Sequence, residues 1–239
     1  MKSKKRIRSI AWLLCLVLIA SLFPLTAQAS LSEPTATDVT IAQVESPYYA
    51  HFPDIVNVPA SVYGGTYPNG KLLVAYYKNV THAPSSSAQP FGVIQIVEST
   101  DNGQTWSEPR DVMTPEKLVE LGICTADKQV ESRDPNFAIL SDGTLLLTFF
   151  TRRYGTDGFV KAYIMESTDG GDTWGTPVPI QCTSLDAWYA KRGDIAVFDD
   201  DQILIPLYGA PASASGNQTA VNILATRTGP DVYKRQRHI

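Results

Sequence analysis

The sequence predicts an all-β protein built from consecutive four-stranded antiparallel units, and two observations support this. A nine-residue turn motif, ESTDNGQTW at Glu98–Trp106, recurs as ESTDGGDTW at Glu166–Trp174. Asn69-Gly70 and Asp142-Gly143 each precede a run of apolar residues, which is a strong signal for a β-hairpin. Four-stranded units repeated at this spacing are typical of the blades of a β-propeller.

The expected strands follow from these apolar runs and their flanking turns. The first unit contains Lys71–Tyr77. The second unit contains four strands: Asn136–Leu140, Leu145–Thr151, Val160–Ser167 and a short one after Trp174. The third unit contains Asp194–Phe198, Gln202–Tyr208 and a strand at about Val221–Thr226. The one helix expected is Pro115–Leu121, with Thr114 as its N-cap.

The N-terminus has the pattern of a secretory signal peptide at residues 1–29. A basic segment, Lys2–Arg8, precedes the apolar run Ile10–Leu25, and Ala27-Gln28-Ala29 supplies a cleavage site. We expect a secreted, cell-surface or periplasmic protein that is free of the membrane after cleavage, with a linker at residues 30–47. In an oxidising compartment Cys124 and Cys182 can form a disulfide, and the sequence leaves their pairing open.

Composition excludes some classes of function. The chain has 44% hydrophobic and 18% charged residues and a net charge of −4, as in an ordinary globular protein. No stripe of Lys and Arg indicates nucleic-acid binding. The cysteine spacing fits no zinc site, and we expect neither a metal nor a cofactor.

The repeated pattern Ser-x-Asp-x-Gly-x-x-Trp resembles the Asp-box of the sialidase and BNR-repeat superfamily. The resemblance covers nearly all of the chain after the linker, so residues 48–230 are assigned to one propeller domain. It implies a six-bladed sialidase-type β-propeller in the full protein, of which about three blades are present in a truncated chain. Residues 231–239 are interpreted as a non-native tail.

The motif residues are interpreted as structural. Their Asp side chains can accept backbone N–H groups of their own turn, their Gly residues can adopt positive φ, and their Trp rings can pack between sheets. The two sets are Ser99, Asp101, Gly103 and Trp106, and Ser167, Asp169, Gly171 and Trp174.

The polar starts of the three innermost strands are the predicted site. One of Asp54, Asp134 and Asp194 is expected to be the catalytic acid/base. Arg133 and Arg192 are expected to bind a substrate carboxylate. Further substrate-binding candidates are Arg152, His51, Trp188, Tyr189 and Tyr208. The alternative is that these Arg and Asp side chains pair with one another and hold the blades together.

The resemblance implies a secreted glycoside hydrolase, an exo-sialidase or a related exo-glycosidase, that acts on terminal sugars of glycans. Two departures from the sialidase pattern favour a related specificity. Phe52-Pro53-Asp54-Ile55 has no arginine where the family has its first one, and the loop Asn79–Pro90 has no acidic residue. The alternative function is a propeller that binds a glycan or a protein without catalysis. The sugar, its linkage and the oligomeric state are not fixed by the sequence.

Overall fold

The computed structural model describes residues 39–81, 91–126, 130–153, 160–199, 202–213, 219–227 and 235–238. The predicted signal peptide, most of the linker and much of the predicted tail lie outside these ranges. All strands belong to one compact unit, Thr40–Ile239. In the described part of the chain, no helix is long and apolar enough to cross a membrane.

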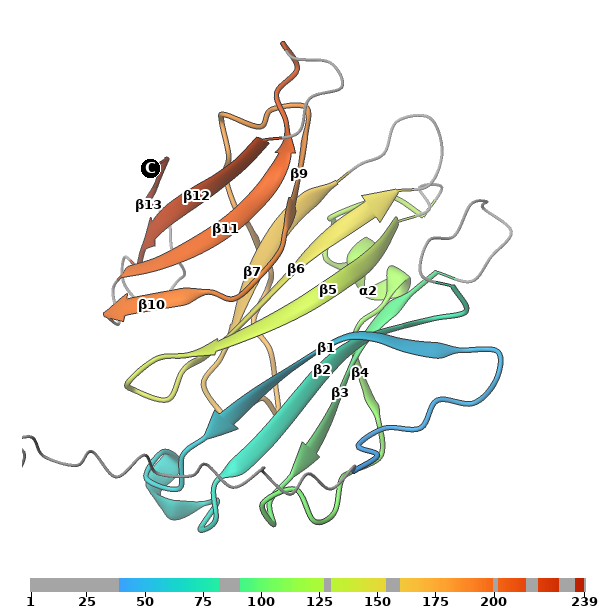
Figure 1. The fold of residues 1–239 in the computed structure, drawn as a ribbon, viewed down its shortest axis with the longest axis vertical. Coiled ribbons are helices and arrows are strands. Elements are labelled where there is room, and N and C mark those ends of the chain that lie inside the picture. The colour runs from blue at the N-terminus through green and yellow to red at the C-terminus, as the bar shows by residue number, and fades with distance from the viewer. Residues whose placement is uncertain are drawn as a thin grey trace, which may run out of the picture. The chain divides into compact units, whose positions relative to one another are not determined.

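Three antiparallel sheets follow one another along the chain (Figure 1). Sheet one contains β1 (Tyr49–Val58), β2 (Lys71–Asn79), β3 (Val93–Ser99) and β4 (Arg110–Met113). Sheet two contains β5 (Val130–Ile139), β6 (Leu145–Arg153), β7 (Lys161–Ser167) and β8 (Val178–Pro179). Sheet three contains β10 (Ala196–Asp199), β11 (Gln202–Ala210), β12 (Thr219–Thr226) and β13 (Arg235–His238), with β9 (Trp188–Lys191) also paired to β11. Each sheet is a propeller blade, so the all-β propeller prediction is confirmed.

We call the first strand of each sheet the inner strand. Strand limits differ from the predicted ones mainly at the inner strands of sheets two and three. β5 starts at Val130, six residues before the predicted start at Asn136. Four of those extra residues, Glu131–Asp134, are polar yet buried, which the sequence pattern alone does not indicate. In sheet three the inner strand is split into β9 and β10. The segment Arg235–His238 of the predicted tail pairs with β12 as β13.

The core depends on sheet two, which is apolar on both faces. Leu145, Leu147 and Phe149 of β6 pack in a cluster with sheet one. Leu146 and Phe150 of the same strand pack in a second cluster with sheet three. A strand that is buried on both faces reads as a continuous apolar run, and this is the pattern of β6.

Helix α2 (Pro115–Glu120) confirms the single helix predicted. The Thr114 side chain accepts a hydrogen bond from the Lys117 backbone N–H at 3.2 Å, and Pro115 occupies the first turn. Both features favour a helix start, because they satisfy or remove donors that have no partner there. Leu118 anchors the helix in the cluster between sheets one and two.

Cys124 and Cys182, the two cysteines of the folded unit, are not joined by a disulfide. Cys182 is buried in the cluster between sheets two and three, and Cys124 packs against the cluster between sheets one and two. The two cysteines thus lie at different clusters of the core and do not pair, which was left open by the sequence.

Trp174 provides a test of the packing between sheets one and two. It is half-buried against that cluster and stacks on Phe137 with ring centroids 6.1 Å apart. We expect Trp174→Ala to lower the free energy of unfolding by roughly 2–3 kcal/mol, somewhat less than for a fully buried large side chain. Urea denaturation measures this, with Val119→Ala on the exposed side of α2 as the control. A loss below about 1 kcal/mol would contradict the packing role.

Candidate functional site

The inner strands of sheets one and two carry a bulge at the same place. In β1 the register shifts between His51 and Asp54, and in β5 it shifts between Arg133 and Asn136. In both cases one extra residue is accommodated opposite the neighbouring strand. Bulges redirect side chains and are frequent beside active sites.

Strained backbone marks both bulges. The first bulge residue has a positive φ, 51° at Phe52 and 47° at Asp134, and a proline follows each of them. Positive φ is uncommon for residues other than glycine and is concentrated at functional sites. In sheet three the break between β9 and β10 takes the place of the bulge, with Gly193 at φ 87°.

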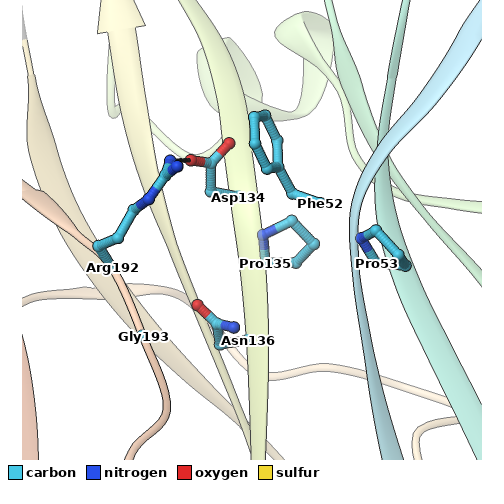
Figure 2. A pocket seen from close by; sticks show the side chains of 7 residues that line it. All are labelled: Phe52, Pro53, Asp134, Pro135, Asn136, Arg192 and Gly193. Carbon is cyan, nitrogen blue, oxygen red and sulfur yellow. Dashed lines mark hydrogen bonds and ion pairs between the residues drawn. The ribbon is translucent and has the colours of Figure 1, made fainter.

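These three irregularities line one pocket of about 200 Å³ (Figure 2). Every lining residue belongs to a bulge or to the break. They are Phe52, Pro53, Asp134, Pro135, Asn136, Arg192 and Gly193. The pocket therefore lies where three inner strands change direction, and two of the predicted site residues, Asp134 and Arg192, line it.

An ion pair between Asp134 and Arg192 crosses the pocket from sheet two to sheet three. The Arg192 guanidinium donates to Asp134 Oδ2 at 2.7 Å, and it lies 5.1 Å above the ring of Phe52. The Arg192 side chain is 57% exposed, whereas that of Asp134 is 8% exposed. Figure 2 shows Arg192 extended toward Asp134.

Lys191 is a residue of this site that the sequence reasoning missed. It is fully buried, and its ammonium donates to Asn136 Oδ1 at 2.7 Å and to the carbonyl of Gly193. Burial lowers the pKa of Lys191 to about 7, although nearby carboxylates oppose this change. Those carboxylates are Asp54, Asp194 and Asp134. The three predicted acid/base candidates are thus brought around one buried ammonium.

The three carboxylates have different surroundings. Asp134 lines the pocket. Asp54 is half-buried, and its Oδ2 accepts the backbone N–H of Phe137 at 2.6 Å, which links β1 to β5. Asp194 is exposed.

Arg133 does not share the surroundings of Arg192. It is nearly fully buried, with Nε 3.6 Å from Glu131 Oε1 and its guanidinium 4.8 Å from the ring centre of Tyr77. Glu131 is fully buried and also accepts from the Tyr77 hydroxyl at 2.9 Å. Arg133 directly precedes the bulge of β5, whereas Arg192 lies in the break between β9 and β10. The two arginines are therefore not equivalent.

The remaining substrate-binding candidates lie outside the pocket lining. Tyr189 is a core residue, contrary to prediction. Its hydroxyl donates to the carbonyl of Ile180 at 2.6 Å, and burial raises its pKa to about 12. Trp188 and Tyr208 pack edge to face, with ring centroids 5.7 Å apart.

The last two candidates are also part of strand packing. His51 is half-buried with its ring 6.0 Å from that of Tyr77. Arg152 pairs in register with Glu131, one residue before the end of β6. Neither residue lines the pocket.

The repeated turn motifs have the same hydrogen bonds in both copies. In the second copy the Ser167 hydroxyl donates to Asp169 at 2.7 Å, Gly171 N–H donates to Ser167 at 2.8 Å, and Thr173 N–H donates to Asp169 at 2.9 Å. Burial acts to raise the pKa of Asp169, but these hydrogen bonds outweigh it and hold the pKa below its ordinary value. A carboxylate committed to its own turn has a structural role.

The first copy repeats this geometry. Ser99 Oγ donates to Asp101 at 2.7 Å and accepts from Gly103 N–H at 2.9 Å. Hydrogen bonds from Thr105 and Ser99 lower the pKa of Asp101 to about 2. Trp106 packs on a small cluster formed by Val74 and Tyr76 of β2 and Val97 of β3.

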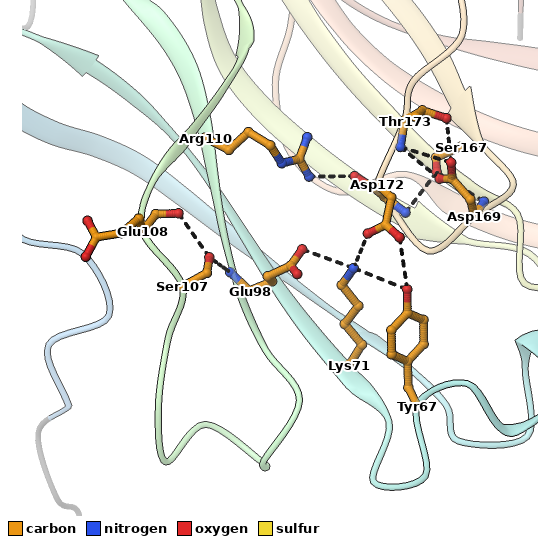
Figure 3. Close-up of polar contacts among 11 residues, drawn as sticks. Tyr67, Lys71, Glu98, Ser107, Glu108, Arg110, Ser167, Asp169, Asp172 and Thr173 are labelled. Carbon is orange, nitrogen blue, oxygen red and sulfur yellow. Dashed lines mark hydrogen bonds and ion pairs between the residues drawn. The ribbon is translucent and has the colours of Figure 1, made fainter.

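The second turn motif also fastens sheet two to sheet one (Figure 3). Lys71, fully buried on β2, reaches Asp172 at 2.6 Å and Glu98 at 3.0 Å. Arg110 donates to the carbonyl of Gly171 at 2.6 Å. None of these residues lines the pocket, so the motif contributes to the assembly of the sheets.

Lys191 predicts a pH dependence of stability. Its pKa is about 7 in the folded chain and near 10.5 when unfolded, so between these values the unfolded state binds the extra proton. Stability should rise with pH through this window, by up to about 1.4 kcal/mol per pH unit. Urea unfolding at pH 7, 8 and 9 should show this rise in the wild type and lose it in Lys191→Met. Lys161→Met, at an exposed position, is the control. Parallel wild-type and Lys191→Met profiles would disprove the shift.

Comparison with protein-family models gives no match, and neither does comparison with curated protein sequences. Solved structures do match. One, a protein of unknown function from Dyadobacter fermentans DSM 18053, has a TM-score of 0.57 at 16% identity, covering 81% of this chain and 55% of that one. Zg3597, a family 117 glycoside hydrolase from Zobellia galactanivorans, has a TM-score of 0.51 at 13% identity, covering 79% and 56%.

The Penicillium chrysogenum α-L-arabinanase complexed with arabinobiose is similar too, with a TM-score of 0.52 at 20% identity and coverage of 80% and 51%. The chain spans about half the length of the solved structures that it matches. At these identities the likeness shows the fold alone, an all-β propeller that this chain has in common with glycoside hydrolases.

Proposed function

We propose that the protein is a secreted glycoside hydrolase that removes a terminal sugar from a glycan, with that sugar held between the bulges. The observation that carries this proposal is Asp134, a nearly buried carboxylate on strained backbone that lines the pocket and, like Asp54 and Asp194, interacts with the buried Lys191. Hydrolysis of a glycosidic bond generally uses two carboxyl groups in different protonation states. The likeness to two glycoside hydrolases supports the same class of reaction.

The surroundings of the carboxylates suggest how the roles divide. A guanidinium ion pair favours the ionised form of a carboxyl group, so Asp134 is assigned as the base, nucleophile or charge stabiliser. Asp54 is engaged by a backbone N–H. Asp194 is exposed, and no hydrogen bond or ion pair engages it among the described residues. Asp54 and Asp194 are therefore the two candidates for the proton donor.

The size of the pocket fits a single sugar residue. Its volume of about 200 Å³ is below the roughly 300–1,000 Å³ of pockets that take larger ligands. The predicted signal peptide would bring the protein to extracellular glycans. Sialidase activity in particular remains a prediction of the turn motifs, as one member of this class of exo-glycosidases.

Binding of a glycan without hydrolysis is the second candidate function. It is favoured by the engagement of Asp134 with Arg192 and of Asp54 with Phe137, which gives both carboxylates a structural task. Calorimetry with a glycan ligand, followed by analysis of the sugar for cleavage, distinguishes a binding protein from an enzyme.

The full-length protein should release nitrophenol from at least one member of a panel of 4-nitrophenyl glycosides. Asp134→Asn should lower kcat/KM for that substrate by at least about 100-fold, as expected for loss of a catalytic carboxylate. Glu116→Gln, on the exposed start of α2, is the control and should leave kcat/KM unchanged. An inactive wild type, or an Asp134→Asn variant with full activity, would refute the proposal.

A further inference from the structure

Arg133, Lys191 and Arg192, the cations near the pocket, each already have polar partners within the protein, and this bears on the charge of the substrate. We infer that the pocket takes a neutral terminal sugar and excludes sugars that carry a carboxylate. The inference rests on the proposed function and names its substrate class. It runs against the sequence-based expectation that Arg133 and Arg192 bind a substrate carboxylate.

Arg192 is the only charged side chain of positive sign among the described residues that line the pocket. Its guanidinium is already bound to Asp134 Oδ2 at 2.7 Å. A sugar carboxylate that bound Arg192 would compete with Asp134, whose side chain is only 8% exposed. Displacing Asp134 would cost a nearly buried carboxylate its ion pair with Arg192, which is unfavourable.

Lys191 gives no second site for an anion. Its side chain is fully buried, and its ammonium is used by Asn136 Oδ1 and the Gly193 carbonyl. Three carboxyl groups, those of Asp54, Asp134 and Asp194, lie near Lys191, so carboxyl groups outnumber the cations at this place. The local field therefore repels a further negative charge.

Arg133 is committed in the same way. It is nearly fully buried with Glu131 on one side and the ring of Tyr77 on the other. Glu131 is itself fully buried and depends on polar partners of this kind. Withdrawing Arg133 to meet a ligand would remove the cation next to that buried carboxylate.

A neutral sugar can use the pocket as it stands. Its hydroxyl groups can donate to Asp134 without displacing Arg192, because a carboxylate accepts several hydrogen bonds. The Asn136 amide uses its oxygen for Lys191, which leaves its N–H₂ group to donate to a hydroxyl. Phe52, Pro53 and Pro135 supply apolar walls for the C–H faces of the ring.

The first arm of the test uses hydrolysis by the full-length protein. Neutral 4-nitrophenyl substrates (α-L-arabinofuranoside, β-D-glucoside and β-D-galactoside) are compared with the acidic β-D-glucuronide, α-D-galacturonide and an α-sialoside. Hydrolysis confined to neutral substrates is the expected result. Hydrolysis of an acidic substrate would overturn the inference and leave the proposed function intact. Inactivity on the whole panel would count against the proposed function, and the second arm would then decide the inference.

The second arm measures binding of D-galactose and D-galacturonate by NMR, without any need for turnover. Asp134→Asn releases Arg192 from its carboxylate, so the affinity for galacturonate should increase about tenfold or more over the wild type. The double variant Asp134→Asn/Arg192→Gln should lose this gain, and Glu116→Gln should match the wild type. Stronger binding of galacturonate than galactose by the wild type, or no gain in Asp134→Asn, would refute the inference.

Discussion

The rest of the structure depends on the need to cover sheet two on both faces. β6 places Leu145 and Leu147 on one face and Leu146 on the other, and each set is buried in its own cluster. Burial of that apolar surface requires one sheet on each side. The inner strands β1, β5 and β9–β10 are consequently neighbours, and a pocket can form where they change direction.

Neighbouring inner strands bring charges together in a poorly solvated place, where each charge needs a partner. The pairs Glu131–Arg133 and Asp134–Arg192 meet this need, and Lys191 lies among carboxylates. These residues can therefore hold the sheets together and also contribute to a ligand site. The ion pair that joins sheets two and three also sets the charge that a ligand meets.

Sequence reasoning succeeded where apolar runs and turn residues dominate. β6, β7, β11 and α2 were predicted to within about two residues, because two-sided burial and helix capping leave clear patterns. It failed at the start of β5, because buried Glu131 and Arg133 have the composition of a loop.

The residues predicted for the site do not have equivalent positions in the structure. A bulge changes which side chains share a face of the sheet. The sequence around Asp134 does not indicate that this residue has a positive φ. Arg133 and Arg192 therefore looked equivalent when they are not. Lys191 was overlooked because complete burial of a lysine depends on partners from other sheets, namely Asn136 and Asp54.

The matching irregularities of the three inner strands give the fold an interchangeable position. Sheets one, two and three present an aromatic ring, a carboxylate and a guanidinium there, as Phe52, Asp134 and Arg192. The backbone sets the direction in which the side chain points, and the identity of the side chain determines the chemistry. Duplication of such a blade would copy the backbone geometry without determining which residue occupies this position. Substitutions at these three positions could therefore change the chemistry of the pocket while the apolar clusters stay unchanged.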